Sequence, residues 1–273
     1  MESMYNDTHC SISLRGKPSE LPVIPYIKEL YDFLEWDEIE SVFGFTDQYC
    51  PLYGGREYKP ELSLSFENLQ ELREYDIGLR LPLTNHFVTE EAYEQSRVFL
   101  DTHHWPGNSV IVLQPVLGEW LARDYPWYVI EVSVIRDYAP EAVDKVLEKY
   151  PWINNLVLDM QYSQVSVHER LSKIVNKDKV RMFANARCRL FCNNPICYLA
   201  HSQNNKAFAD SSIPVTAERC SRPQLPKDPY TVFDLEPMKA MGFTKYKFIP
   251  PNAKQRPLGG PGFESTLPRY DQA

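Results

Sequence analysis

The sequence contains no apolar run long enough to cross a membrane. A membrane helix needs about 20 consecutive apolar residues, and no stretch of the chain approaches that length. The first ten residues are polar and do not form a basic segment followed by an apolar one, so a secretory signal is not expected. We therefore expect a soluble, cytoplasmic protein with no membrane association.

The sequence also lacks any block of Lys or Arg longer than a pair, and its formal net charge is -8. Electrostatic binding of a broad stretch of nucleic-acid phosphates needs clustered positive charge. No extended nucleic-acid groove is therefore expected. A small-molecule or nucleobase-like substrate is compatible with this charge, and a protein partner or a homo-oligomer is left open.

Several catalytic motifs are missing as well. The sequence has no His-Glu-x-x-His motif of a zinc hydrolase and no serine in a nucleophile elbow. No Gly-rich turn that could cradle a dinucleotide phosphate follows the first expected strand. No local motif therefore indicates zinc-dependent hydrolysis, serine hydrolysis or dinucleotide binding.

What the sequence does contain is a regular alternation of helical and strand patterns, with 43% apolar residues to supply a core. Expected strands cover residues 42–45, 77–83, 110–113, 128–134, 153–158, 180–184 and 245–249. Expected helices cover residues 23–34, 66–74, 90–100, 116–123, 140–150, a segment opened by a capping box of Ser166 and Glu169, and 235–241. Strands this apolar, separated by helices, predict a parallel sheet with helices on its faces.

This alternation predicts an α/β fold, and we favour a TIM-like (β/α) barrel, complete or lacking a unit, over an open doubly wound sheet. One barrel domain is expected over residues 1–249. An irregular tail rich in Pro and Gly is expected over residues 250–273.

Four of the six cysteines, namely Cys188, Cys192, Cys197 and Cys220, fall within one stretch of the chain. The first three follow the strand expected at 180–184, which places them at the functional face of a barrel. Thiolates bind zinc or iron–sulfur clusters. Gaps of three, four and 22 residues lack the close pairs typical of structural zinc. We therefore favour an iron–sulfur cluster over zinc, with buried free thiols as the third interpretation.

The segment from Asn185 to His201 resembles the cysteine motif of the collagenase-like peptidases of unclassified mechanism, family U-thirty-two, and of their relatives in ubiquinone synthesis and RNA base hydroxylation. The blocks at 79–86, 108–112, 125–133 and 234–247 are similar to other blocks of that family. The resemblance implies a barrel-like fold. In the relatives that hydroxylate without oxygen, it implies a four-iron four-sulfur cluster held by four cysteines. By position, Cys188, Cys192 and Cys220 resemble ligands, and Cys197 is the fourth candidate by proximity.

In a barrel, residues just beyond the strand ends line the site. Asn85, Arg187 and Lys247 are the candidates for positioning substrate at the reaction centre, and His201 is a candidate proton donor or partner to a cluster sulfur. Further candidate substrate contacts are Arg56, Thr84, Gln114, Ser133 and Asp159. Each of these polar residues could equally serve as a helix cap, a turn or a loop anchor.

Five histidine and cysteine residues are set apart from this group. His103 and His104 are expected in a turn at the opposite end of the barrel. His9, Cys10 and Cys50 are expected on loops, and they show no spacing typical of metal ligands.

The leading hypothesis is an iron–sulfur enzyme that modifies a small or nucleobase-like substrate by an oxygen-independent hydroxylation or a related redox reaction. One alternative is a collagenase-like peptidase. The other is a non-catalytic assembly or binding protein in which the metal only stabilises the cysteine loop.

Overall fold

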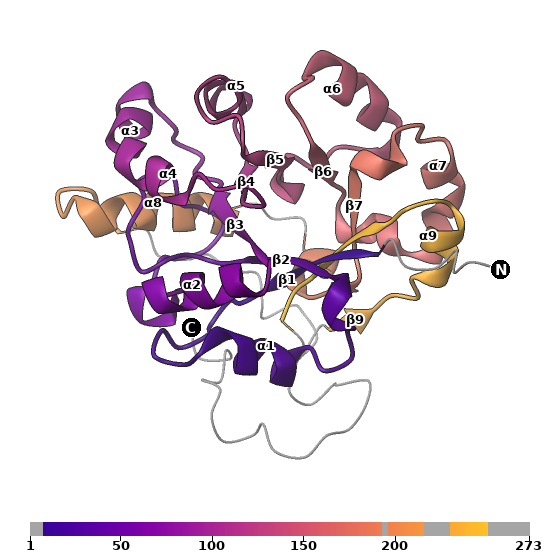
Figure 1. Cartoon of the computed structure of the whole chain (residues 1–273). Helices are drawn as coiled ribbons and strands as arrows, with labels where there is room; N and C mark the ends of the chain where they lie inside the picture. The colour runs from indigo at the N-terminus through magenta and orange to yellow at the C-terminus, as the bar shows by residue number, and fades with distance from the viewer. Residues whose placement is uncertain (1–7, 193–195, 216–229, 251–273) are drawn as a thin grey trace.

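The computed structural model describes residues 8–192, 196–215 and 230–250. Its centre is a closed barrel of parallel strands in the order β1-β10-β7-β6-β5-β4-β3-β2. The helices surround these strands (Figure 1). The predicted (β/α) barrel is confirmed. The barrel strands are β1 (His9–Ser13), β2 (Ile39–Phe43), β3 (Gly78–Leu83), β4 (Ser109–Val112), β5 (Val129–Val132), β6 (Asn155–Val157), β7 (Val180–Phe183) and β10 (Lys245–Phe248).

At least one helix stands between each two successive barrel strands, as a (β/α) barrel requires. The helices are α1 (Val23–Leu30), α2 (Phe66–Glu74), α3 (Glu90–Gln95), α4 (Arg97–His103), α5 (Pro115–Asp124), α6 (Val143–Lys149), α7 (His168–Ser172), α8 (Ile196–Ala209) and α9 (Glu236–Ala240). A two-stranded antiparallel sheet, β8 (Asn185–Ala186) with β9 (Thr231–Val232), lies beyond the end of β7. Short 3-10 turns complete the connections.

Three local predictions need correction. His9 and Cys10 lie in strand β1 rather than on a loop, and they pair with β10 in the closed sheet. The predicted capping box of Ser166 and Glu169 does not form, because α7 begins after Val167 and has no side-chain cap. Residues 196–209, for which no helix was predicted, form helix α8.

Helix caps explain several boundaries. Thr89 caps α3 as predicted, because its hydroxyl accepts a 3.1 Å hydrogen bond from the backbone N–H of Ala92. The helix predicted over 90–100 is divided at Ser96, whose hydroxyl instead donates to the carbonyl of Ala92 at 2.7 Å. Ser65 caps α2 in the same way as Thr89 caps α3, through the backbone N–H of Asn68.

The interior of the barrel is polar, unlike the layers of branched apolar side chains that usually fill such barrels. Arg80 on β3, Glu131 on β5, Arg181 on β7 and Lys247 on β10 join in one buried set of ion pairs. The apolar residues that alternate with them, such as Leu79 on β3, belong to the surrounding hydrophobic core. The strands are therefore apolar outside, against the helices, while the inside holds this charged group together with apolar residues such as Ile111 and Phe183.

The predicted C-terminal tail lies outside the described residues, apart from Pro250. In the described part of the chain, no helix has both the length and the apolar character needed to traverse a bilayer.

Candidate functional site

The carboxyl ends of parallel barrel strands meet at one end of the barrel, and most of the predicted site residues lie there. The residues that follow their strands at this end are Thr84 and Asn85 after β3, Gln114 after β4, Ser133 after β5, Asp159 after β6 and Arg187 after β8. Lys247 differs from them because it lies within β10 and points into the barrel. The structure thus gathers these residues at one end, on separate loops.

Asn85 joins three segments at this end. Its Nδ2 donates to the carbonyls of Tyr53, at 3.0 Å, and Ser202, at 3.2 Å, and its Oδ1 accepts from the backbone N–H of Phe87 at 2.9 Å. The side chain is buried. Asn85 therefore holds the loop after β2 and helix α8 against its own loop, and a direct contact with substrate stays a prediction.

The other strand-end polar residues also have structural partners. The amide Nε2 of Gln114 donates to the carbonyl of His86 at 3.2 Å, and the hydroxyl of Ser133 accepts from the backbone N–H of Ile135. The backbone of Thr84 lies so close to Gly54 that a Cβ at that glycine would collide with it. Gly54 is therefore needed for close packing of the loops after β2 and β3.

Helix α8 is fixed to this end of the barrel by buried hydrogen bonds. Asn205 accepts from the backbone N–H of Tyr58 at 2.8 Å, and its Nδ2 donates to the carbonyls of Tyr53 and Arg56 at 3.1 and 2.8 Å. The hydroxyl of Ser202 accepts from the backbone N–H of His86 at 3.2 Å. These bonds set the position of the helix that carries a cysteine in its first turn.

Two of the predicted metal ligands lie near one guanidinium. Cys188 begins the 3-10 turn η8 (Cys188–Phe191), Cys197 lies in the first turn of α8, and both interact electrostatically with Arg56. Burial lowers the pKa of Arg56, but Tyr198, Cys188 and Cys197 raise it, and the net change is upward. The Tyr198 ring centre lies 5.4 Å from the guanidinium carbon. Within the described residues, Arg56 has no carboxylate partner.

The other two predicted ligands are placed less completely. Cys192 is the residue at which η8 ends, and Cys220 lies outside the described residues. Across 8–192, 196–215 and 230–250, no three His, Cys, Asp or Glu side chains converge as a metal site. The donor chemistry suits a soft metal, since two thiols share a cation that offsets the negative charge of thiolate ligands.

The turn that bears Cys188 is held by Arg189, which the sequence did not single out. Its Nε donates to Asp159 Oδ2 at 2.8 Å, and its Nη2 lies 3.4 Å from Asp137 Oδ2. Burial raises the pKa of Asp159, although the nearby Arg189 acts in the opposite direction. Asp159 thus anchors the cysteine turn to the loop after β6.

His201 and Arg187 lie at the same end and differ in charge. Burial lowers the pKa of His201 to about 4, and the positive charges of Arg56, Arg15 and Lys59 act in the same direction. The imidazole is therefore neutral near pH 7. Arg187 is half-buried beside the Tyr230 ring, and its Nε has no hydrogen-bond acceptor among the described residues.

Glu131 is the central acid of the barrel interior, and the sequence reading did not select it. Its Oε2 accepts from Arg80 Nη1 and Arg181 Nε, both at 2.9 Å, and its Oε1 accepts from Lys247 Nζ at 3.0 Å. Glu40 binds the far side of both arginines, at 3.0 and 2.7 Å. The signal in the sequence was a single charged residue inside each of three otherwise apolar strands, as in Val129-Ile130-Glu131-Val132.

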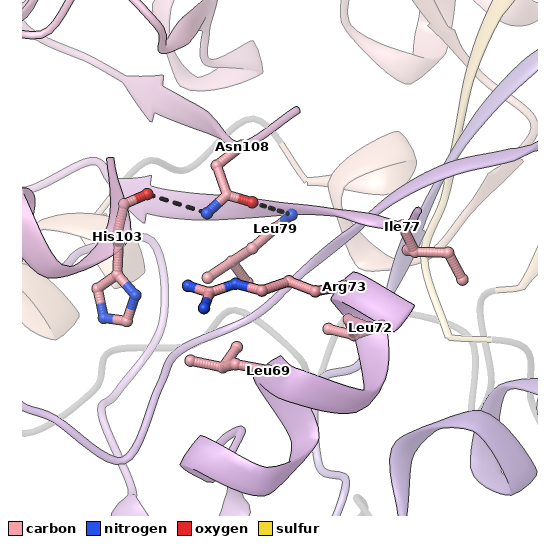
Figure 2. A pocket seen from close by; sticks show the side chains of 7 residues that line it. All are labelled: Leu69, Leu72, Arg73, Ile77, Leu79, His103 and Asn108. Atoms are coloured by element: carbon pink, nitrogen blue, oxygen red, sulfur yellow. Dashed lines mark hydrogen bonds between the residues drawn. The ribbon is translucent and has the colours of Figure 1, made fainter. Parts of the chain in front are cut away.

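Two hollows are lined by other residues, the larger beside the loops that follow β1 and β2 and the smaller near the start of β3. One is an open depression of about 610 Å³ whose lining includes the acidic side chains of Glu20, Asp47, Glu61, Glu67 and Glu71. The other is a cavity of about 10 Å³ between α2, β3 and the end of α4, where Arg73 and the His103 imidazole lie (Figure 2). Neither is lined by a predicted site residue.

The comparisons with known proteins bear mainly on the fold. No protein-family profile matches the chain, and no curated protein matches it. Among solved structures, the chain is similar to one described as the U32 peptidase Mk0906, with a TM-score of 0.56 over 92% of this chain and 96% of that one. The two sequences are 13% identical. The likeness therefore shows a shared barrel fold.

Proposed function

We propose that the chain is an enzyme that holds an iron–sulfur cluster at the mouth of its barrel. The ligands would be Cys188, Cys192 and Cys220, with Cys197 as the fourth. The observation that carries the proposal is that Cys188 and Cys197, from different elements, both lie within electrostatic range of Arg56, which has no carboxylate partner among the described residues. A cytoplasmic setting is part of the proposal, because reducing conditions keep cysteines available to metals.

A cluster bound there would supply electron transfer with a small or nucleobase-like substrate: in an oxygen-independent hydroxylation, or a related redox reaction, it would pass the two electrons that the substrate loses to an external electron acceptor. The surrounding residues supply charge and position. Arg56 offsets the negative charge of the thiolates, while Arg187 and Lys247 offer cationic donors to the substrate. His201, neutral because of burial and nearby cations, serves as a hydrogen-bond partner rather than as a charged acid.

The decisive measurement is the metal and sulfide content of the protein purified without air. We expect about four iron and four sulfide per chain, with a brown absorption that oxygen destroys. If the protein contains zinc and no sulfide, the site is a zinc site rather than a cluster. If it contains neither iron nor zinc, the metal proposal is wrong. Cys188→Ala and Cys197→Ala should lose iron. Cys50→Ala should retain it, because the Cys50 thiol is buried beside Ser96.

The substrate can be sought by mass spectrometry of metabolites and nucleosides from cells that lack the protein. A product that disappears and returns with the wild-type gene, but not with Cys188→Ala, identifies the reaction. If Cys188→Ala prevents folding and no product depends on the wild-type protein, the metal has the structural role of a non-catalytic assembly or binding protein.

A peptidase is the second candidate, favoured by the similarity of the fold to a structure described as a U32 peptidase. Digestion of a peptide library, with and without a metal chelator, tests it. Cleavage that survives in Cys188→Ala and Lys247→Met would assign proteolysis to other residues. Cleavage products absent at every enzyme concentration would remove the peptidase candidate.

A further inference from the structure

The charges inside the barrel do not balance. Three cations, Arg80, Arg181 and Lys247, contact two carboxylates, Glu131 and Glu40. If all five are ionised, three positive and two negative charges leave this ion-paired group with a surplus of one positive charge, and Lys245, which is half-buried on the same face and donates to Asn155, adds a further cation near the start of β10. Arg80, Arg181 and Glu131 have almost no exposed surface. An uncompensated buried charge is costly, so such a cluster favours an additional anion.

Lys247 is the cation of this cluster that lies towards the carboxyl end of the barrel. In the register of β10 and β7, Lys245 pairs with Arg181, and Lys247 lies one interior layer further along, opposite Phe183. Its side chain is 8% exposed, against 0% for Arg181. The Nζ atom has one carboxylate partner, Glu131, and lies 4.4 Å from the centre of the Phe43 ring. An ammonium group has three donors, so donor capacity remains.

A second observation marks the same layer. Ser11 on β1 is the register partner of Lys247 on β10, so the two side chains lie on the same face of the sheet, inside the barrel. The Ser11 hydroxyl is completely buried, and it has no hydrogen-bond partner among the described residues. Buried hydroxyls are normally hydrogen-bonded. A donor and a surplus cation therefore lie side by side at the upper layer of the barrel interior.

We propose that Lys247 and Ser11 bind the carboxylate group of a small-molecule ligand at this layer. A carboxylate carries one negative charge, which matches the surplus, whereas a phosphate monoester near pH 7 carries between one and a half and about two. Its two oxygens can accept from the ammonium and the hydroxyl at once. The proposal assigns a substrate class, small carboxylates, to the enzyme proposed above. It rests on that function only in treating the bound carboxylate as a substrate.

Titration calorimetry with benzoate tests the site at constant ionic strength, with benzamide as the uncharged isostere and inorganic phosphate as the competing anion. Benzoate should bind, benzamide should not, and phosphate should bind more weakly. Lys247→Met should weaken benzoate binding about tenfold or more, and Ser11→Ala should weaken it by a smaller factor. Lys245→Met is the matched control, because Lys245 lies nearer the start of the same strand and donates to Asn155.

Lys247→Met should remain folded, since it leaves two cations with two carboxylates, and urea unfolding checks this. Ser11→Ala removes a hydroxyl that has no described partner, so it provides a second folded variant. The proposal is overturned if no benzoate binds, if benzamide or phosphate binds as tightly, or if Lys247→Met binds benzoate like the wild type. Iron analysis of the same anaerobic preparation separates the two proposals, because protein that binds benzoate but contains no iron would overturn the cluster and support the carboxylate site.

Discussion

Glu131 and Arg181 form an ion pair inside the barrel, with Arg181 Nε donating to Glu131 Oε2 at 2.9 Å and neither side chain exposed. The two residues are 50 positions apart in sequence, on β5 and β7. The pair exists only because the closed barrel directs both strands' interior positions towards one axis. Most of what the structure adds to the sequence depends on such contacts.

Glu131→Gln should destabilise the protein by about 3 kcal/mol, because it leaves three buried cations with a single carboxylate, Glu40. Urea unfolding measures the change. Glu141→Gln is the control, since Glu141 forms its ion pair with Arg170 at the exposed surface and should change stability little. Equal effects of the two substitutions would contradict the buried network.

Glu131 also predicts that the free energy of unfolding decreases at acid pH. Burial raises the pKa of Glu131, but Lys247, Arg80 and Arg181 lower it, and the net result is a pKa of about 2 against an ordinary value of 4.5. Its contribution is therefore present above pH 4.5 and is lost as the pH falls towards 2. Unfolding curves between pH 6 and 3 should show a shallower decline in Glu131→Gln than in the wild type. A parallel decline would contradict this assignment.

His103 offers a prediction of the opposite sign. Its imidazole is buried beside the small cavity in Figure 2, and neither ring nitrogen has a hydrogen-bond partner among the described residues. Replacing it with Leu should stabilise the protein by about 1 kcal/mol, because a buried polar group without a partner is removed. Thermal unfolding at pH 7 measures the gain. A lower melting temperature would mean that the ring nitrogens have a partner.

The titration of His103 supplies an independent check. Burial, followed by the charge of Arg73, lowers its pKa to about 4 from an ordinary value of 6.5. The neutral ring therefore contributes stability above pH 6.5, and this contribution declines as the pH falls towards 4. The stability gained in His103→Leu should consequently grow between pH 6.5 and 4. A gain independent of pH would place the imidazole in a more solvated position.

Asn205 should matter for the cysteine site although it is not a ligand. Asn205→Ala removes the buried bonds that fix α8 to Tyr53, Arg56 and Tyr58, and we expect a loss of about 2–3 kcal/mol. If the cluster forms, the iron content should fall at the same time, because Cys197 is carried by α8. Gln203→Ala, on the same helix but only half-buried, is the control. Full iron content in Asn205→Ala would contradict a role of α8 in positioning a ligand of the metal.

Most helices and most strands were predictable because their signals are local. The apolar run of residues 110–113 and the cap at Thr89 each depend on a few neighbouring residues. Strand β1 was missed because His9–Ser13 contains three polar residues, and only the polar interior of this barrel makes that pattern suitable for a strand. Helix α8 was missed because hydrogen bonds of Asn205 and Ser202, rather than an apolar stripe, hold it in place.

The candidate site also has parts that were predictable from the sequence and parts that were not. Residue type and order were enough to predict a cysteine group after the strand of residues 180–184, whereas metal binding by these cysteines and a site role for Lys247 stay predictions. The sequence could not place Arg56 beside Cys188 and Cys197, since that meeting requires α8 and the loop after β2 to be docked together.

By itself, the sequence determined that strands and helices alternate and that four cysteines gather late in the chain, and it favoured a (β/α) barrel over an open sheet. These follow from the spacing of apolar residues and from residue chemistry, which act over short distances along the chain. Only the tertiary structure decided that Glu131 binds Arg80, Arg181 and Lys247, and that three cations meet two carboxylates in the barrel interior. Such contacts depend on strand register and barrel closure, which bring distant positions onto one axis.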